Sequence, residues 1–555
     1  MASTPTTKSQ VQAYRFVLKR MESALVRRDA VMLHDPMRTH IRAGIVGLCL
    51  ALVAVAGVFI YGFFKPKEAL GTSDGIVMGS DSGSVFVLLN NPSQRLVPAL
   101  NLASARLILV KQAGNGGVGN AATATPRRVK DDVLKDVPRE PIAGIPGAPA
   151  DIPGANELVD PKWTLCDTTT QDESLPEVAR IERPTIETTA IVGMDRPGRD
   201  LAPGEALLVK AVDGKYFLVF DGRRAAVDVT NDAVQLAFGI AAVSETVMRD
   251  ERRISTGLLN AIPEAPALVS PITELGEPSA VPELDGRPVG TVIEVARVET
   301  FEYYVIVQGG VQQVPKSLAD LIRFTVSEDE DFFKVSPEDI VKVPKSSELD
   351  TSGFPAELPK VLSVADSRLA CLNWTIVEGQ QRTSITVANQ LTMASEKQRP
   401  VKLAQHDGSG DRLDYVFVPT GRGAAVRGVV PGQPDGTGTI FLVTDNGAKF
   451  GVPSWNGRSA TELAGAIGLT TIRPAPEAIL RLLPSGPALD PDQAVRTFDS
   501  VPVVDGAGAT LPQPDQQAVP LAPVEPPVEG EEVVDPFNPL PGGGAGEGEG
   551  DGSGG

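Results

Sequence analysis

The chain offers few side chains that could serve as nucleophiles or general bases. It contains three histidines, and His406 is the only one that follows the first 42 residues. In the segment "AQHDGSGDRLDY", Ser409 and Asp411 stand near His406, and these are the residue types of a hydrolase triad. A triad needs a scaffold that aligns its three groups, whereas these residues crowd into one Gly-rich turn. The segment therefore indicates a solvated loop.

Metal sites are not indicated either. Asp407, Asp411 and Asp414 do not have the spacing of a calcium-binding loop. Cys166 and Cys371 are not at the spacing of zinc ligands. We therefore predict no metal, no cofactor and no catalytic residue.

A phosphate-binding site is not readable in the sequence. The pattern G-x-x-x-x-G-K-[ST] is absent, and the nearest fragments are "DGKYF" around Lys215 and "NGAKFG" around Lys449, both in hairpin turns. The acidic run "SEDEDFF", residues 327–333, is typical of a solvated face. These observations favour a protein without catalytic turnover.

The first large structural element that the sequence predicts is a membrane span. The stretch Ala43–Phe64, "AGIVGLCLALVAVAGVFIYGFF", holds 22 residues without a charge. As a helix it would reach roughly 33 Å, enough for a bilayer core. A removable signal peptide would be shorter and would follow a short basic leader, and a buried core helix is the other alternative. We predict an uncleaved single-span anchor, in which Ala43, Gly47 and Ala51 form a small-xxx-small row that lets a second helix approach.

Charge predicts the direction of this anchor. Residues 1–42 carry eight Lys/Arg against three Asp/Glu, although the whole chain has a formal net charge of -19. Positive flanks stay in the cytoplasm, so the N-terminus is expected inside and the acidic remainder outside. The acidic exterior part lacks the positive field that phosphate backbones require, so we predict no nucleic-acid binding.

An amphipathic helix is predicted ahead of the span. Thr7 and Gln10 have the spacing of a capping box, and the helix should end before Pro36. Apolar residues at intervals of three and four form one stripe: Val11, Tyr14, Leu18, Met21 and Leu25. The stripe is too short for a coiled coil. We expect it to dock on a partner protein, or else to lie on the inner membrane face.

The cysteines indicate one cross-link. Cys49 lies inside the predicted span, whereas Cys166 and Cys371 fall in the part expected outside, where oxidising conditions permit a disulfide. We predict that Cys166 pairs with Cys371. Two separately buried thiols are the alternative.

The exterior part carries a recurring pattern of an apolar strand, a turn, a second short strand and a helix-like segment. It occurs near residues 83–109, 214–240, 301–325 and 438–469. The gaps between the central aromatic residues are long, short and long, which implies two pairs; these residues are Phe86, Phe217, Tyr304 and Phe441. A fifth hairpin is predicted at residues 414–429, with no helix after it.

We interpret this pattern as an α+β fold of four ββα repeats with duplicated halves. A tryptophan beside a cysteine follows the first repeat of each pair, as Trp163 with Cys166 and as Cys371 with Trp374. The disulfide would then join the halves across a pseudo-twofold axis. The alternative is that short hairpins resemble one another by composition alone.

The remaining segments complete the predicted organisation. Pro/Gly-rich stretches at residues 139–156 and 259–286 are either ordered connectors or loops. From about residue 505 the chain becomes Pro-rich and then Gly/Glu-rich, which cannot bury enough apolar surface to order itself. We predict a cytoplasmic segment 1–42, a span 43–64, a repeat domain 65–505 and a disordered acidic tail 506–555.

The segment "TKSQVQAYRFVLKRMESALVRRDAVMLHDPMR", residues 7–38, followed by one span, resembles the EccB family. EccB is a membrane component of the actinobacterial type VII (ESX) secretion systems. The resemblance continues through the four repeats and the paired cysteines and covers nearly all of the chain except the tail. It implies an elongated periplasmic domain of four repeat modules around a central β region, with a disulfide between Cys166 and Cys371. It also implies assembly in the inner membrane with the EccC motor ATPase, EccD, EccE and a mycosin protease.

Two functions follow from these observations. In the first, the chain is a structural subunit whose stripe docks on cytosolic partners and whose repeats form a homo-oligomer in the periplasmic part of an export channel. In the second, it is an envelope hydrolase, since the family is often labelled as an ATPase. Because no nucleotide-binding pattern is present, we carry over no catalytic residue and favour the first.

Overall fold

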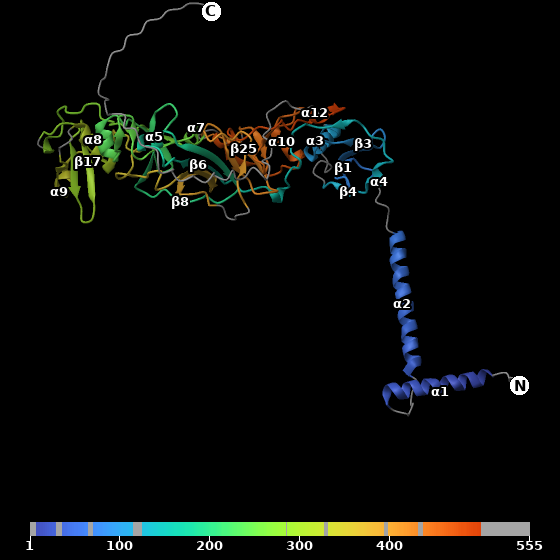
Figure 1. Cartoon of the computed structure of the whole chain (residues 1–555). Coiled ribbons are helices and arrows are strands. Elements are labelled where there is room, and N and C mark those ends of the chain that lie inside the picture. The colour runs from blue at the N-terminus through green and yellow to red at the C-terminus, as the bar shows by residue number, and fades with distance from the viewer. Residues whose placement is uncertain are drawn as a thin grey trace, which may run out of the picture. The chain divides into compact units, whose positions relative to one another are not determined.

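The computed structural model describes residues 7–28, 36–64, 70–114, 125–284, 286–326, 331–392, 398–430 and 437–500. The chain begins with two helices, α1 (Lys8–Arg27) and α2 (Pro36–Phe64), and continues into a β-rich part (Figure 1). The predicted tail at residues 506–555 and residues 327–330 of the acidic run lie outside the described residues.

Helix α1 begins at the predicted capping box. The Thr7 N–H donates to Gln10 Oε1 at 2.9 Å, and Thr7 Oγ1 accepts from the Gln10 N–H at 3.4 Å. The helix ends at Arg27, before Pro36 as predicted. The five stripe residues are all exposed, from 41% at Val11 to 81% at Leu25. Within the described structure nothing covers the stripe.

Helix α2 contains the predicted apolar stretch. Its segment Ile41–Tyr61 has a mean hydropathy of 2.7, so its length and composition suit a membrane span. Ala43, Gly47 and Ala51 are exposed along the helix. A Cβ added at Gly47 would meet no atom within 4 Å, so this row has room for a second helix.

Four modules in the β-rich part share one topology. Each has three antiparallel strands, a helix, a fourth strand that pairs parallel with the first, and a second short helix. The four strands of each module therefore lie in the order 4-1-2-3, and one of the four sheets is extended by two further short strands. The predicted ββα segments correspond to the second strand, the third strand and the first helix of each module, so the sequence pattern missed one strand on each side.

The bounds of these elements follow the chain. Module one contains β1 (Gly75–Gly79), β2 (Val85–Leu89), β3 (Arg95–Pro98), α3 (Leu102–Ala113), β4 (Arg127–Val129) and α4 (Asp131–Leu134). Module two contains β9 (Glu205–Lys210), β10 (Tyr216–Phe220), β11 (Arg223–Val227), α6 (Asp232–Phe238), β14 (Glu251–Arg253) and α7 (Thr256–Ala261). Module three contains β16 (Val292–Ala296), β17 (Phe301–Val307), β18 (Gly310–Val314), α8 (Lys316–Val326), β19 (Phe333–Lys334) and α9 (Pro337–Lys342). Module four contains β25 (Ala424–Val429), β26 (Ile440–Val443), β27 (Lys449–Val452), α10 (Ala460–Ala466), β28 (Arg473–Pro476) and α11 (Glu477–Leu480).

Each module closes with the same short sequence pattern, an apolar residue followed eight positions later by an apolar residue and proline. These pairs are Val129 and Val137-Pro138, Ile254 and Ile262-Pro263, Val335 and Val343-Pro344, and Ala475 and Leu483-Pro484. In every module the proline carbonyl accepts a hydrogen bond from an N–H of the third strand, at 2.8 to 2.9 Å. The pattern thus marks where the chain returns to the sheet.

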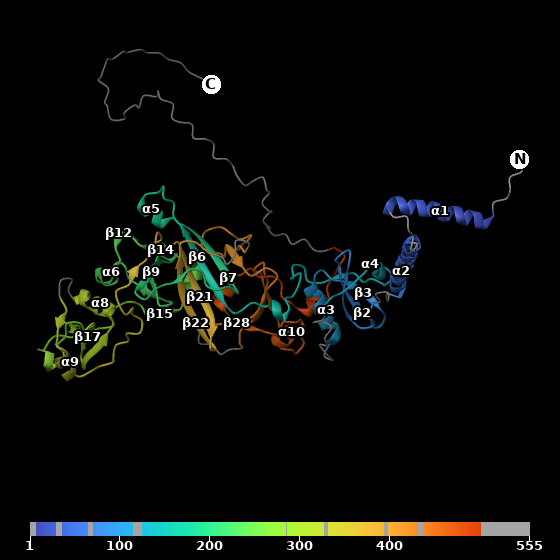
Figure 2. The same cartoon turned by 90° about the horizontal axis from the view of Figure 1, so that it is seen from below.

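A separate sheet, the central sheet, lies between the modules in the chain and is drawn in Figure 2. Its strand order is β23-β24-β7-β6-β21-β22-β8. The bounds are β6 (Trp163–Thr170), β7 (Thr185–Val192), β8 (Arg199–Asp200), β21 (Leu369–Val377), β22 (Gln380–Ala388), β23 (Val401–Lys402) and β24 (Tyr415–Phe417). Strands β6 and β21, which come from the two halves of the sequence, pair antiparallel at its middle.

The fifth hairpin predicted at residues 414–429 is wrong. Its first strand, β24, pairs parallel with β7 in the central sheet, whereas its second, β25, is the first strand of module four. β24 has its partner β7 far back in the chain, and β25 pairs with the later strands β26 and β28, so the short spacing between them did not indicate a hairpin.

Hydrophobic cores join the modules in pairs. One core combines Leu107 of module one with Leu442 of module four, and another combines Phe238 of module two with Val305 of module three. A third core joins one face of the central sheet to modules two and four, with Trp163 among its members. Module one (blue to cyan) therefore lies beside module four (orange to red), as both views show (Figures 1 and 2).

Short elements connect these parts. They are β5 (Ile142–Ala143), α5 (Glu177–Glu182), β12 (Ala242–Ser244), β13 (Val247–Met248), β15 (Glu264–Ala265), β20 (Lys360–Val361), α12 (Pro491–Ala494), β29 (Thr497–Phe498) and two 3-10 turns at Ala155–Glu157 and Pro282–Leu284. In the two Pro/Gly-rich stretches, Ile152 and Leu268 are buried in the module cores. These stretches are therefore ordered connectors that pack along the modules.

Candidate functional site

The middle of the central sheet is cross-linked. Cys166 on β6 and Cys371 on β21 occupy facing positions, with 4.0 Å between their Cα atoms, and they form a disulfide. The predicted pairing is confirmed. Both cysteines are at most 1% exposed and pack with Ile191, Leu369 and Phe417. The disulfide therefore joins the two halves of the chain in a buried position.

The tryptophans beside the cysteines face each other across the same strand pair. Trp163 lies three residues before Cys166 and Trp374 three residues after Cys371, so antiparallel pairing places them opposite one another. Both are buried in the core on the sheet face opposite the disulfide. The order W-x-x-C followed by C-x-x-W thus reflects cross-strand pairing, because equivalent positions of a duplication would repeat the order.

The sheet face that carries the disulfide, the polar face, combines the apolar neighbours of the cysteines with rows of threonine and asparagine side chains. The register aligns Thr189, Cys166, Cys371 and Thr386 in one row across four strands. In the next row Thr164 Oγ1 donates to Asn373 Oδ1 at 2.9 Å, and Asn373 Nδ2 donates to Thr386 Oγ1 at 3.0 Å. These buried groups satisfy one another, as buried polar groups must.

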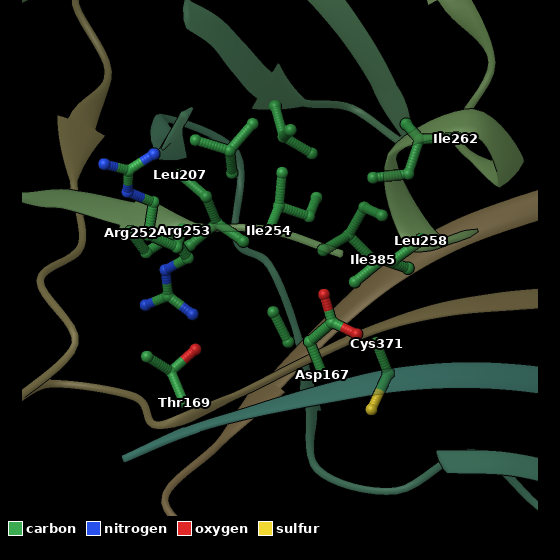
Figure 3. Close-up of a pocket in the computed structure, with 13 residues that line it drawn as sticks. Asp167, Thr169, Leu207, Arg252, Arg253, Ile254, Leu258, Ile262, Cys371 and Ile385 are labelled. Atoms are coloured by element: carbon green, nitrogen blue, oxygen red, sulfur yellow. The ribbon is translucent and has the colours of Figure 1, made fainter. Parts of the chain in front are cut away.

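Asp167 lies next to Cys166 but points to the opposite face, where it anchors module two (Figure 3). Its carboxylate accepts from the Ser255 N–H at 2.7 Å, from Ser255 Oγ at 2.8 Å and from Thr188 Oγ1 at 3.0 Å. Ser255 is the N-cap residue of α7. Complete burial raises the pKa of Asp167 to about 6, although these hydrogen bonds and Arg252 favour the charged form.

Arg252 on β14 is the cation whose charge favours the ionised form of this carboxylate. Its Nη2 donates to the carbonyl of Ser363 at 3.1 Å and to the carbonyl of Ser367 at 2.8 Å, while Nε and Nη1 have no partner among the described residues. Burial lowers the pKa of Arg252 to about 10. A cavity of about 10 Å³, bordered by both Asp167 and Arg252, lies beside them (Figure 3). It has room for about one water molecule.

This arrangement can hold parts of the fold together, and it cannot admit a substrate of ordinary size. It connects β6, the start of α7 and residues 363–367, which precede β21. The described residues that border the small cavity are otherwise mostly apolar. We interpret the cross-linked middle of the sheet as a structural junction.

Asp167→Asn should change how stability depends on pH. An aspartate in the unfolded chain titrates near pH 3.9, whereas Asp167 holds its proton up to about pH 6 in the folded protein. As pH rises through this window, the unfolded state releases its proton first and gains relative to the folded state. Between about pH 4 and pH 6, the contribution of Asp167 to the free energy of unfolding therefore falls by roughly 3 kcal/mol. Above about pH 6 this contribution no longer changes with pH.

Chemical unfolding of the full chain in detergent at pH 4 to 7 measures this effect as the difference between wild type and Asp167→Asn. Asp172→Asn is the matched control, because Asp172 is exposed and its hydrogen bond to Ser174 lowers its pKa. A difference for Asp167→Asn that does not vary with pH would show that burial leaves its pKa in the usual range.

The candidate triad residues do not form a triad. His406 Nε2 lies 3.4 Å from Glu187 Oε1, and its ring packs edge-on against Tyr415. Ser409 Oγ donates to Asp407 Oδ1 at 2.7 Å, and no hydrogen bond joins Ser409 to His406. The described residues contain no cluster of His, Cys, Asp or Glu that could hold a metal ion.

The two lysines near Gly-rich turns have local partners. Lys215 pairs with Asp213 at 2.9 Å on an exposed turn. Lys449 donates to the carbonyl of Leu480, and burial lowers its pKa. The two lysines lie in different modules, two and four.

Sequence reasoning missed Asp167 and Arg252. Asp167 could have been identified as the single acidic residue in the β-rich segment "WTLCDTTT", because a charged residue in a buried strand needs partners. Arg252 follows another charged residue in "DERRIST", so nothing in its neighbourhood distinguished it.

One membrane-length helix followed by a cross-linked repeat domain defines a class of protein, the membrane-anchored β-rich subunit. The model of the family described as "Type VII secretion system ESX-1, transport TM domain B" matches residues 3–503. The chain belongs to this family, and the resemblance to EccB proteins is confirmed.

Curated relatives and solved structures agree with this assignment. The ESX-5 secretion system ATPase EccB5 of Mycobacterium tuberculosis is 31% identical over 508 residues, which cover 90% of this chain and 94% of the relative. A chain of the intact ESX-5 inner membrane complex has a TM-score of 0.63 and 28% identity, covering 92% of this chain and 99% of its own length. A chain of the EccB3 dimer from the ESX-3 core complex has a TM-score of 0.60 and 27% identity, covering 76% of this chain and 100% of its own length.

Proposed function

We propose that the chain is a structural membrane subunit of a type VII (ESX) secretion complex, which anchors the complex and forms part of its periplasmic export path. The observation that carries this proposal is the likeness to a chain of the ESX-5 inner membrane complex, which covers 92% of this chain. Because the match covers 92% of the chain, it extends over all four modules and the central sheet and is not limited to one module.

The proposed topology places residues 1–42 in the cytoplasm, residues 43–64 in the inner membrane and residues 65–505 in the periplasm, followed by the acidic tail. The eight Lys/Arg of the first 42 residues support this direction. The disulfide supports it independently, because such a bond persists in an oxidising compartment.

The proposed partners are a second copy of this chain and the other membrane components, namely the EccC motor ATPase, EccD, EccE and a mycosin protease. A dimer of EccB3 among the structural neighbours supports self-association. The exposed stripe on α1 and the small-residue row on α2 are the proposed contact surfaces on either side of the membrane interface. Outside the membrane, the modules supply the surface for the homo-oligomer.

A duplicated architecture would suit this scaffold. An axis that relates module one to module three and module two to module four also relates the contact between one and four to the contact between three and two. Those are the contacts in the two shared cores. The pairing of Cys166 with Cys371 then lies at the proposed pseudo-twofold axis. The modules would act as spacers held at a cross-linked centre.

The alternative is an envelope hydrolase acting in the same secretion system. Its support is that the relatives carry the word ATPase in their names. Lys215 and Lys449 are the residues that such an activity would most simply use, since each lies at a Gly-containing turn.

The test is to purify the tagged full chain in mild detergent, once with its partners and once alone. With partners, we expect a large assembly in which nucleotide hydrolysis follows the motor ATPase. Alone, we expect hydrolysis at background level, unchanged in Lys215→Ala and Lys449→Ala. Turnover by the chain alone that Lys449→Ala abolishes would establish the hydrolase instead. Recovery of the chain from membranes without any partner would contradict the structural role.

A further inference from the structure

A cavity of about 380 Å³ opens on the polar face of the central sheet, beyond the disulfide. The register builds its floor, because Thr164, Asn373 and Ser384 form one row across β6, β21 and β22. Thr375 and Arg382 form the next row on the same face. This volume lies within the range of small-molecule sites, about 300–1,000 Å³.

The loop after β7 forms a wall of this cavity and is held in place at both ends. Gly193 and Gly198 have φ of +74° and +76°, where other residues are strained. A Cβ at Gly193 would lie 2.5 Å from Val159 Cβ, and one at Gly198 would lie 2.5 Å from the carbonyl oxygen of Val387. Asp195 and Arg196 between them are therefore presented by a fixed backbone.

The charged groups that border the cavity are mainly positive, although the chain as a whole is acidic. Lys162, Arg196 and Arg382 stand against one carboxylate, Asp195. Lys162 Nζ is paired with Asp195 Oδ1 at 2.5 Å. The two arginines remain as the cations that a ligand would meet.

The arginines have unused donor groups. Arg196 directs Nη1 to Asp200 at 2.7 Å and to Ser384 Oγ at 3.4 Å, which leaves Nε and Nη2 without a hydrogen-bond partner in the described structure. Arg382 has no ion pair or hydrogen bond with any described residue. A ligand with several acceptor oxygens matches these donors.

We propose that this cavity binds a small carboxylate ligand, held by the guanidinium groups of Arg196 and Arg382, with its remaining polar groups at Ser384 and Thr375. The planar fork of a guanidinium matches the two oxygens of a carboxylate. Met194 and Val377 on the border offer apolar contact for a short carbon chain. The donors on this border are side chains on strands and on one loop, with no helix N-terminus of the kind that phosphate groups favour.

The experiment titrates the full chain in detergent at low ionic strength with N-acetyl-L-glutamate, measured by calorimetry and by tryptophan fluorescence. We expect saturable binding, weakened at least tenfold in Arg196→Gln and in Arg382→Gln. Asp195→Asn should strengthen binding several-fold, because it removes the negative charge on the cavity border and releases Lys162 from its ion pair. That gain could not arise from a loss of folding. Arg128→Gln, an exposed arginine on β4, is the matched control and should leave binding unchanged.

Two further probes identify the ligand chemistry. The neutral N-acetyl-L-glutaminamide should not bind, and the blocked peptide acetyl-Ala-Glu-Ala-amide should bind more tightly than N-acetyl-L-glutamate if the natural carboxylate belongs to an acidic peptide. The reverse ranking would assign a free small acid. Equal binding of inorganic phosphate, equal binding of the neutral amide, or undiminished binding by Arg196→Gln/Arg382→Gln would overturn the proposal.

Discussion

Replacing both cysteines by alanine, Cys166→Ala/Cys371→Ala, should lower the free energy of unfolding by about 2–5 kcal/mol. The disulfide joins residues 205 apart in the sequence, so it removes a large loop-closure entropy from the unfolded chain. Because both side chains are buried among apolar residues, alanine also leaves small cavities, which add to the loss. Chemical unfolding of the full chain in detergent, under non-reducing conditions, measures the change.

Cys49→Ala is the matched control, since Cys49 is exposed on α2 and takes no part in the cross-link. It should leave the unfolding midpoint of the β-rich part unchanged. Peptide mapping without reductant should recover the Cys166 and Cys371 peptides linked. Alkylation of both thiols in the native protein would contradict the prediction, and so would a double variant as stable as wild type.

The helix-and-strand content of the modules was readable where the sequence pattern is local. Alternation around Phe217 or Phe441 and the turn residues that follow predicted the second strand, the third strand and the helix, because those elements are neighbours along the chain. The first and fourth strands of each module pair in parallel across a helix, and short strands such as β19 carry too little periodicity to be recognised. The recurring apolar-Pro ending was present in the sequence, but single hydrophobic positions separated by eight residues stand out only once the sheets are known.

The disulfide was predictable because only two cysteines lie outside the membrane helix. The meaning of the neighbouring tryptophans was misread, because their mirrored order reflects antiparallel pairing of β6 with β21, and that pairing is known only from the register of the sheet. The buried network of Asp167 was also out of reach. Its partners Thr188 and Ser255 are distant in sequence and ordinary in type, so only the tertiary fold brings them together.

The stripe on α1 is an apolar surface outside the membrane-length helix that the described structure leaves without a partner. Tyr14 is 66% exposed and Leu18 is 47% exposed, in a helix whose ends are both defined by capping interactions. Because capping defines where the helix begins and ends, the stripe residues stay on one side of it. An exposed apolar side on such a helix indicates an interaction site. Lipid and a partner protein are the two surfaces available to it.

Tyr14→Asp/Leu18→Asp should release the chain from its membrane complex while the β-rich part stays folded. Burying each of these side chains contributes roughly 1.5–3 kcal/mol, so replacing both by a charged residue should reduce the recovery of partners at least tenfold. The matched control is Gln12→Asp/Ser23→Asp, which introduces the same charge on the opposite side of the helix and should leave recovery unchanged. Affinity purification in mild detergent, quantified by mass spectrometry, measures the loss, and intact Cys166–Cys371 cross-linking reports the folding of the remainder. Undiminished recovery of partners in Tyr14→Asp/Leu18→Asp would assign the stripe to the inner membrane face, because lipid contact can be lost without dissolving the complex.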